Sequence, residues 1–493
     1  MKKNLNSSLL IASLVGCNSV FSAENPMIQK EKPNVLFLFV DDMTYNGLNI
    51  LGNDEIISPN LDSLISRGVR FTNAYIMGGW NGAISIASRS QLITGSYLWN
   101  THNAEKEHFE RNYNNRSLWP QMMKDNGYKT FQTGKWHMNY IGAKDVFDEA
   151  VKVRGGMPHS VNAAYNRPIN EQDSLWLPWD TSYGGYWEGG KHWSEVLADE
   201  TIKYIEKNSD SKQPLFMFCS FNAPHDPRQS PREYVEMYDI DKIKIPDNFL
   251  PLHPFADEMG CGKDLRDEAL APFPRSFFSV QKHRQEYYAL ITHLDVQIGR
   301  ILRSLHDNNM DKNTLIIFAA DNGLSVGNHG LMGKQSMYDH SVKVPLVFCG
   351  LDLPQGEKRS QLVYLQDLVP TLYDMLGIQL PEDMDFVSQK QILYNEKAKS
   401  KREYIYSAYL EDTQRMITDG RYKLFFIPKA NRILLFDLKK DPMEKKNLFG
   451  IKKYDKAVKN LLEGYIVLSE EAGDKFNLED YFPDLFRKYL GSR

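Results

Sequence analysis

Residues 35–42 read VLFLFVDD, six consecutive apolar residues followed by two aspartates. The apolar run lacks the alternation of a half-buried strand, so it is typical of a strand buried on both faces of a parallel sheet. The run ends where Asp41 and Asp42 begin. This stretch therefore predicts a parallel strand that carries two carboxylates at its carboxyl end.

Two further apolar runs are followed by polar residues in the same way: 314–320 (TLIIFAA) before Asp321 and Asn322, and 214–221 (PLFMFCSF) before His225; a third strand-like segment, 129–133, precedes Lys135 and His137. Segments with helical periodicity lie between the runs, at 61–68, 117–126, 194–207 and 286–306. Strands alternating with helices predict a doubly wound α/β sheet. Because ligands bind beyond the carboxyl ends of such strands, these polar residues are predicted to share one site.

The polar residues at the strand ends favour a hard metal ion. An aspartate pair after a strand is often only a helix cap or a turn, and a lone histidine is often a loop residue. Independent caps, however, have no reason to fall at one edge of one sheet. Carboxylate and amide oxygens without a cysteine or histidine cluster suit Ca²⁺ or Mg²⁺ better than zinc.

Composition limits the classes of partner. The chain has 493 residues, of which 42% are hydrophobic and 25% charged, and these proportions are typical of a globular protein. The formal net charge of −4 leaves no basic surplus, so nucleic acid is not an expected partner. An anionic substrate would have to be bound by a local cluster of cations.

The first 23 residues are predicted to be a targeting signal. Lys2 and Lys3 precede a short apolar run at residues 9–16 that is too short to span a bilayer. Residues 14–17 (LVGC) resemble a bacterial lipobox, in which Cys17 would be lipidated; cleavage after Ala23 is the alternative. The protein is therefore expected to be exported by a Gram-negative bacterium, either to the periplasm or as an outer-membrane lipoprotein, with no membrane contact beyond the lipid anchor.

Residues 85–95 (SIASRSQLITG) resemble the sulfatase signature, which has Cys or Ser, then Pro or Ala two residues later, then Arg, then Leu-x-Thr-Gly. Other motifs of the family follow in the same order: Asp41-Asp42, 134–137 (GKWH), 223–225 (APH), 321–323 (DNG), 328–330 (NHG), 333–334 (GK), and 441–448 (DPMEKKNL) after Asp437-Leu438. Over residues 32–450 the sequence thus resembles the formylglycine-dependent (type I) sulfatases of the alkaline-phosphatase-like superfamily.

The resemblance implies a large mixed, mostly parallel sheet flanked by helices, within a catalytic domain at 31–385. A smaller C-terminal α+β domain is expected at 400–493. It would contain a short antiparallel sheet, with strands at 403–410, 413–418, 422–426 and 432–436 covered by a helix at 454–469.

The resemblance also implies roles for individual residues. Ser85 would be oxidised to formylglycine (3-oxoalanine), whose hydrate is the nucleophile, since serine is weak without an activating base. One Ca²⁺ per chain would be held by Asp41, Asp42, Ser85, Asp321 and Asn322. Arg89, Lys135 and Lys334 would stabilise the formylglycine and sulfate oxygens. His225 would protonate the leaving alcohol, and His137 would take the proton that releases sulfate.

Two positions depart from the commonest signature. Serine stands at Ser85 where cysteine is usual, and Ala87 stands where proline is commoner. Both imply maturation by the radical-type serine maturase before export, in a bacterium that lives without oxygen.

An aromatic cluster in a glycine-rich segment is a candidate substrate-binding surface: Trp176, Trp179, Tyr183, Tyr186, Trp187, His192 and Trp193. These side chains would either stack on sugar rings or pack an insertion onto the domain. An exported bacterial sulfatase is expected to act on a sulfated carbohydrate, such as a glycosaminoglycan, mucin or an algal polysaccharide.

Two other functions remain open. A phosphoesterase or phosphonate hydrolase of the same superfamily would use Ser85 directly. A two-zinc phosphatase needs a histidine-rich second site, against which Asn322 argues, although His329 and His340 are candidates. A surface lipoprotein that binds sulfated glycans would keep Ser85 unmodified.

Overall fold

The main sheet has eight strands, and β1 (Asn34–Val40) lies near its centre. The computed structural model describes residues 32–165 and 168–491, so the predicted leader with Cys17 lies outside the described residues. β1 pairs in parallel with β7 (Leu215–Ser220) and β8 (Thr314–Ala320). Residues 35–40 are all buried, which explains why this strand is apolar on both faces.

The strand order of the sheet is β10-β2-β9-β8-β1-β7-β5-β6. Its other strands are β2 (Gly68–Phe71), β5 (Lys129–Lys135), β6 (Glu149–Arg154), β9 (Leu346–Cys349) and β10 (Glu357–Arg359). Within this sheet β9 runs antiparallel to its neighbours β8 and β2, and the other pairings are parallel. The prediction of a mixed, mostly parallel sheet is confirmed.

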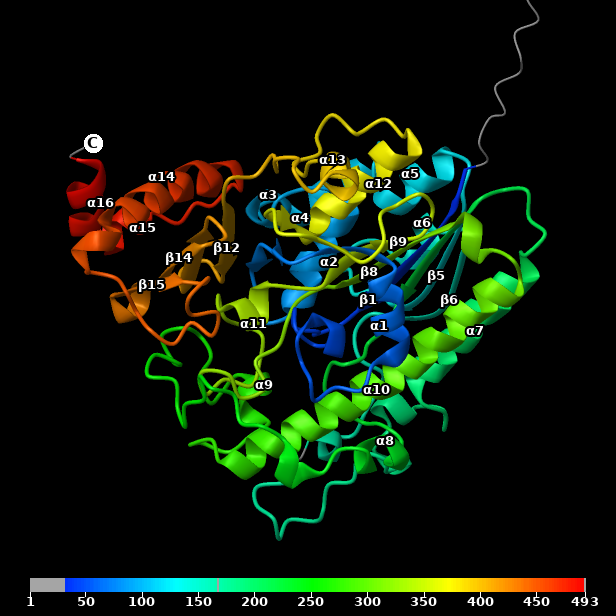
Figure 1. Ribbon diagram of the computed structural model, residues 1–493, viewed down its shortest axis with the longest axis horizontal. Coiled ribbons are helices and arrows are strands. Elements are labelled where there is room, and N and C mark those ends of the chain that lie inside the picture. Colours follow the sequence, from blue (N-terminus) through cyan, green and yellow to red (C-terminus); the bar gives the residue numbers. More distant parts are fainter. Residues whose placement is uncertain (1–31, 166–167, 492–493) are drawn as a thin grey trace, which may run out of the picture. The chain divides into compact units, whose positions relative to one another are not determined.

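Helices cover the sheet on both sides. The α-helices among the described residues up to Tyr394 are α1 (Pro59–Ser66), α2 (Ile84–Thr94), α3 (Leu98–His102), α4 (Glu105–Asn114), α5 (Trp119–Asp125), α6 (Ala143–Val146), α7 (Trp193–Lys207), α8 (Arg232–Glu236), α9 (Arg266–Ala269), α10 (Phe277–Asp307), α11 (Asp339–Val342), α12 (Leu368–Leu376) and α13 (Lys390–Tyr394). In Figure 1, α7 and α10 lie below the sheet, and α5 and α12 lie above it. Among the described residues, no helix combines the length and the apolarity needed to cross a bilayer.

The register of the central strands positions the polar residues that follow them. β1 and β8 pair without a break up to Val40 and Ala320. The next residue of each strand, Asp41 and Asp321, therefore arrives at the same edge of the sheet. The backbone N–H of Asp321 donates to the Val40 carbonyl (3.1 Å), which extends this alignment by one residue.

A second sheet has the order β15-β14-β13-β12-β4. Four of its strands are the predicted antiparallel ones: β12 (Ile405–Tyr409), β13 (Gln414–Thr418), β14 (Tyr422–Ile427) and β15 (Arg432–Asp437). The fifth, β4 (Gly78–Gly79), comes from the segment just before α2. The predicted helix is α14 (Asp455–Glu471), which packs against β12, β13 and β14 and is followed by α15 (Leu478–Tyr481) and α16 (Pro483–Leu490).

Two short strands, β3 (Ala74–Tyr75) and β11 (Val363–Tyr364), form a separate parallel pair. From Pro33 onward the described residues form one compact unit. The C-terminal sheet therefore belongs to the same body as the main sheet.

Candidate active site

Ser85 lies in the first turn of α2, and only 1% of its surface is exposed. Its Oγ is 3.0 Å from Asp41 Oδ1 and 3.2 Å from Asn322 Oδ1. These two acceptors follow β1 and β8, so the neighbouring strand ends both reach the serine hydroxyl. The structure thus brings the predicted nucleophile together with the predicted metal ligands.

The other oxygen donors complete this cluster. Asn322 Nδ2 donates to Asp42 Oδ1 (2.7 Å), and the backbone N–H of Asp42 donates to Asp321 Oδ1 (3.3 Å). Asp41, Asp42, Asp321 and Asn322 have no exposed surface. Potential ligand atoms of Asp41, Asp42 and His225 lie within 4.8 Å of one another. A cluster of buried carboxylate and amide oxygens is the donor set that a hard cation such as Ca²⁺ prefers.

Three cationic side chains pair with these carboxylates. Lys135 Nζ contacts Asp41 Oδ2, and Lys334 Nζ lies 2.7 and 2.9 Å from the two carboxylate oxygens of Asp42. Arg89 Nε donates to Asp321 Oδ2 (2.8 Å). Each buried charge therefore has an opposite charge beside it, which offsets the cost of burial.

The paired charges shift the pKa values of the site. Burial would lower the pKa of Lys334, but Asp42 and Asp267 raise it above its ordinary value, so this ammonium stays charged. Burial and the nearby Asp41 carboxylate raise the pKa of Asp321 to about 6. The site keeps permanent positive charge at Lys334, which suits an anionic ligand.

The two predicted acid–base histidines differ in their surroundings. His225 Nδ1 lies 2.6 Å from the Asp226 carbonyl oxygen, and its Nε2 lies 3.7 Å from Asp42 Oδ2. Burial, reinforced by Lys135 and Arg89, lowers the pKa of His137 to about 2, so its imidazole is neutral at physiological pH. His225 is therefore fixed through Nδ1, whereas the imidazole of His137 is free to accept a proton.

A cavity of about 360 Å³ opens onto this cluster. Five predicted catalytic residues line it: Ser85, Lys135, His137, His225 and Lys334. Arg89 is not among its lining residues; its guanidinium lies deeper, bound to Asp321, the Lys135 carbonyl and Ser220 Oγ. Arg89 therefore supports the cluster from below.

Sequence reasoning missed three polar residues of the cavity wall: Arg266, Asp267 and Gln335. Arg266 forms ion pairs with Asp226 (3.2 Å) and Asp267 (2.6 Å). The neighbouring Glu268 accepts bonds from the backbone of Met332 (2.9 Å) and Gly333 (2.8 Å) and so fixes the loop that carries Lys334. The only sequence signal was the charged run at 266–268, which looks like an ordinary exposed helix turn.

The predicted aromatic cluster does not line this cavity. None of its seven members, Trp176, Trp179, Tyr183, Tyr186, Trp187, His192 and Trp193, lines the cavity at Ser85, and Trp176, Tyr186, His192 and Trp193 are buried. Tyr186 donates to the His225 carbonyl (3.1 Å), and Trp193 donates to Asn222 Oδ1 (3.0 Å). Tyr186 and Trp193 therefore support the loop of His225, whereas sugar contact by the members of the cluster stays a prediction.

His329 and His340 do not line this cavity either. The ring of His329 stacks on Tyr338 at 3.9 Å between centroids, and His340 Nδ1 lies 2.9 Å from Ser341 Oγ. Both side chains are buried in this packing. Within the described residues, these histidines are placed for packing and not beside Ser85.

Comparison with known proteins identifies the family. The model of the sulfatase family matches residues 33–378, and that of the N-sulphoglucosamine sulphohydrolase C-terminal region matches residues 327–470. The chain is 26% identical to an arylsulfatase of Clostridium perfringens over 87% of this chain and 92% of the relative. It is 25% identical to an N-acetylglucosamine-6-O-sulfatase of Bacteroides thetaiotaomicron over 94% of this chain and 90% of the relative.

Solved structures share the fold. A protein in complex with its substrate D-glucosamine-2-N,6-O-disulfate superposes with a TM-score of 0.67 at 21% identity, covering 90% of this chain and 99% of that chain. A phosphonate monoester hydrolase from Silicibacter pomeroyi superposes with a TM-score of 0.69 at 19% identity, covering 90% and 96%. Since the sulfatase model spans more than half of the chain and includes every motif residue of the Ser85 site, the chain belongs to the sulfatase family of sulfuric ester hydrolases.

Proposed function

We propose that this sulfatase hydrolyses O-sulfate esters on the sugars of sulfated glycans, such as glycosaminoglycans, mucin or algal polysaccharides. The observation that carries the proposal is the position of Ser85, which lies between Asp41 and Asn322 in a cavity lined by two lysines and two histidines. Sugar specificity is supported by the N-acetylglucosamine-6-O-sulfatase relative and by the structural relative with a disulfated glucosamine. Arg266, Asp267 and Gln335 add groups that can bind sugar hydroxyls.

The residues of the cluster fit both groups that the family resemblance implies. Asp41, Asp42, Asp321 and Asn322, together with residue 85, would hold one Ca²⁺, which when bound neutralises sulfate charge and orients the nucleophile. Formylglycine made from Ser85 would supply a hydrated aldehyde as the nucleophile. The oxygen-rich, cysteine-free donor set supports calcium over zinc.

The other residues of the site bind sulfate and move protons. The ammonium groups of Lys135 and Lys334 face the cavity and attract the sulfate oxygens, while Arg89 holds Asp321 in place. His225 gives a proton from Nε2 to the leaving alcohol, because its Nδ1–H is held by the Asp226 carbonyl. The neutral His137 accepts the proton whose removal completes sulfate release.

Maturation and location form part of this proposal. A serine at position 85 supports conversion by a radical-type serine maturase before export. The basic start, short apolar run and Cys17 support export by a Gram-negative bacterium, either to the periplasm or as a lipid-anchored outer-membrane protein. The functional division into a catalytic part at 31–385 and a C-terminal part at 400–493 belongs to the same proposal.

The test is peptide mass spectrometry combined with sulfate release. Protein co-expressed with a radical maturase should yield a tryptic peptide, residues 71–89, that is lighter by two hydrogens at Ser85, and it should release sulfate from a small sugar sulfate. The Ser85→Ala variant is the matched control and should release none. If Ser85 stays unmodified and the protein is inactive, although the maturase modifies a control substrate, the result would favour a glycan-binding lipoprotein. Faster turnover of a phosphonate or phosphate ester by unmodified Ser85 would favour the phosphonate hydrolase function.

A further inference from the structure

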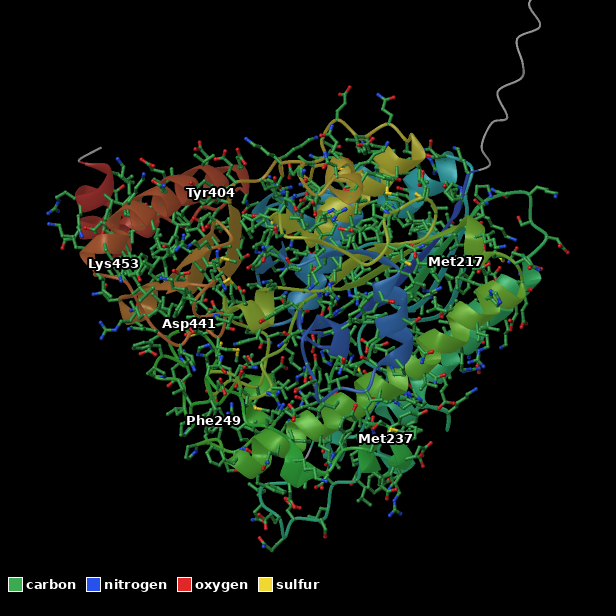
Figure 2. The ribbon with its side chains drawn as sticks, in the orientation of Figure 1. Met217, Met237, Phe249, Tyr404, Asp441 and Lys453 are labelled. Atoms are coloured by element: carbon green, nitrogen blue, oxygen red, sulfur yellow. The ribbon has the colours of Figure 1, made fainter. Side chains whose placement is uncertain are left out.

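The C-terminal part of the chain carries a concentrated positive charge. Residues 439–453 contain six lysines against two acidic residues, although the whole chain has a net charge of −4. We name Lys439, Lys440, Lys445, Lys446, Lys452 and Lys453 the lysine patch; all six are exposed. Figure 2 labels Lys453 and Asp441 in this orange part of the chain.

The two acidic residues of the segment do not neutralise the lysine patch. Asp441 Oδ2 accepts a hydrogen bond from the backbone N–H of Lys446 (2.8 Å). Glu444 is buried and accepts bonds from Lys423 Nζ (2.7 Å) and the backbone of Asp339 (2.7 Å). Among the described residues, no lysine of the patch forms a salt bridge, so its positive charge faces solvent.

A cavity of about 690 Å³ lies beside the lysine patch. One stretch of its wall contains Asn447, Phe449 and Gly450, which separate Lys446 from Lys452 along the chain, and another contains Tyr481, the acidic Asp484 and Lys488. Lys488 Nζ lies 3.3 Å from Asp455 Oδ1, which ties that wall to the start of α14. Lys446 is therefore next in the chain to a lining residue of the cavity, and Lys452 is two residues from one. Arg432, also exposed, adds a further cation to its lining.

The lining of this cavity suits a sugar ring. Tyr481 is 43% exposed, and Phe449 is only partly buried, so aromatic surface is open to a ligand. Aromatic faces bind the apolar faces of ring-shaped ligands, and nearby cations bind their anionic substituents. A flat lipid surface could meet the exposed lysines but could not fill a cavity of this size. The cavity thus favours a sulfated polysaccharide over a membrane.

The same segment is joined to the active site. The backbone N–H of Asp339, to which Glu444 is bonded, lies five residues after the cavity residue Lys334. Five residues of chain span at most about 18 Å. Glu444, in the middle of the lysine segment, is therefore anchored to a residue within about 18 Å of Lys334.

We propose that the lysine patch and its cavity form a second binding site, which holds a sulfated polysaccharide while the Ser85 cavity acts on it. This inference rests on the proposed function, since the bound polymer is of the class that the active site would desulfate. The second site raises the affinity for the polymeric substrate and leaves the chemical step at Ser85 unchanged.

The test measures binding of size-fractionated dextran sulfate to full-length protein carrying Ser85→Ala, with unsulfated dextran as the neutral control. Adding K445Q, K446Q, K452Q and K453Q should raise the Kd for dextran sulfate about tenfold or more at low ionic strength, because four attractive charges are lost. A matched variant, K144Q/K212Q/K312Q/K358Q, removes four exposed lysines elsewhere and should raise the Kd less than twofold.

A second measurement separates this inference from the proposed function. Without the Ser85→Ala change, the patch variant should keep its kcat on a small aryl sulfate, because no patch residue lines the Ser85 cavity. Equal loss of binding in both lysine variants, equal binding of unsulfated dextran, or tighter binding to phosphatidylglycerol vesicles would overturn the inference. Failure of the matured protein to release sulfate would instead overturn the proposed function, since binding is measured without turnover.

Discussion

At the scale of single residues, His225 is held by contacts that fix which of its ring nitrogens faces Asp42. Its Nδ1 is bonded to the Asp226 carbonyl, so Nε2 is the atom left to exchange a proton near Asp42. Asp226 is itself buried and paired with Arg266. The orientation of this imidazole therefore depends on a chain of contacts that ends at the cavity wall.

Replacement of His225 by alanine should slow hydrolysis according to the leaving group. We expect kcat to fall about 10²- to 10⁴-fold on an alkyl sulfate. The loss on an activated aryl sulfate should be much smaller, because its aryloxide leaves without being protonated. The control is His306→Ala, whose side chain is 75% exposed. Steady-state kinetics on both substrates check the prediction, and equal losses would remove His225 from the role of acid.

At the scale of elements, β5 delivers Lys135 through a backbone position that only glycine fits. Gly134 has φ of +92°, and a Cβ there would lie 1.9 Å from the Ser220 carbonyl oxygen of β7. Gly134→Ala should therefore lower the free energy of unfolding by about 3 kcal/mol or more and displace Lys135. Gly127→Ala is the control: it has a similar φ of +88° but open space around its Cβ, so a cost of about 1–2 kcal/mol is expected. Denaturant unfolding measures both, and equal costs would contradict the steric argument.

His253 and His329, which both contact Tyr338, should make the protein sensitive to acid. Burial lowers the pKa of His253 to about 4 and, with His253 and Lys423, lowers that of His329 to about 3. The unfolded chain binds these protons near pH 6.5 and the folded protein does not, so stability is present above pH 6.5 and is lost as the pH falls. Near pH 5, where both histidines are protonated in the unfolded chain and neutral in the folded protein, they should together cost about 2.7 kcal/mol per pH unit. The H253Q/H329Q variant should flatten the pH dependence of unfolding by that amount; an unchanged slope would show that other groups control it.

At the scale of the whole molecule, the C-terminal sheet and the N-terminal half hold each other in place. β4 pairs with β12 of that sheet and lies just before α2, the helix that carries Ser85. The buried guanidinium of Arg415 binds Asp474 at 2.6 and 3.0 Å and lies 5.2 Å from the ring centroid of Trp99. The two parts are therefore expected to unfold together.

Loss of the Arg415–Asp474 pair should destabilise the entire protein. Arg415→Ala leaves the buried Asp474 carboxylate without its cationic partner, which typically costs about 3–5 kcal/mol. The exposed pair Lys459–Glu463 serves as the control, and Lys459→Ala should change stability by less than about 0.5 kcal/mol. Midpoints from tryptophan fluorescence and circular dichroism should shift together. A separate early transition of the C-terminal part would contradict the single cooperative unit.

Several features of this protein were determined by the sequence alone. The apolar runs at 35–40 and 314–320 predicted two strands correctly. A strand that is buried on both faces needs apolar side chains at every position, so its burial is visible in the sequence as a continuous apolar run. The strand ends predicted one edge for Asp41 and Asp321 because parallel strands share a direction. The motif around Ser85 indicated the sulfatase family, and the family resemblance in turn indicated the role expected of each residue.

Other features were decided only by the tertiary structure. Arg266 and Asp267 enter the cavity wall, and β4 joins the C-terminal sheet, through contacts between residues far apart in the chain, which leave no local pattern. The burial of Tyr186 and His192 likewise depends on the loop that packs over them, not on their own neighbours in sequence. Periodicity and motifs report the local environment of the backbone, whereas a cavity is formed by segments that meet only in the folded chain.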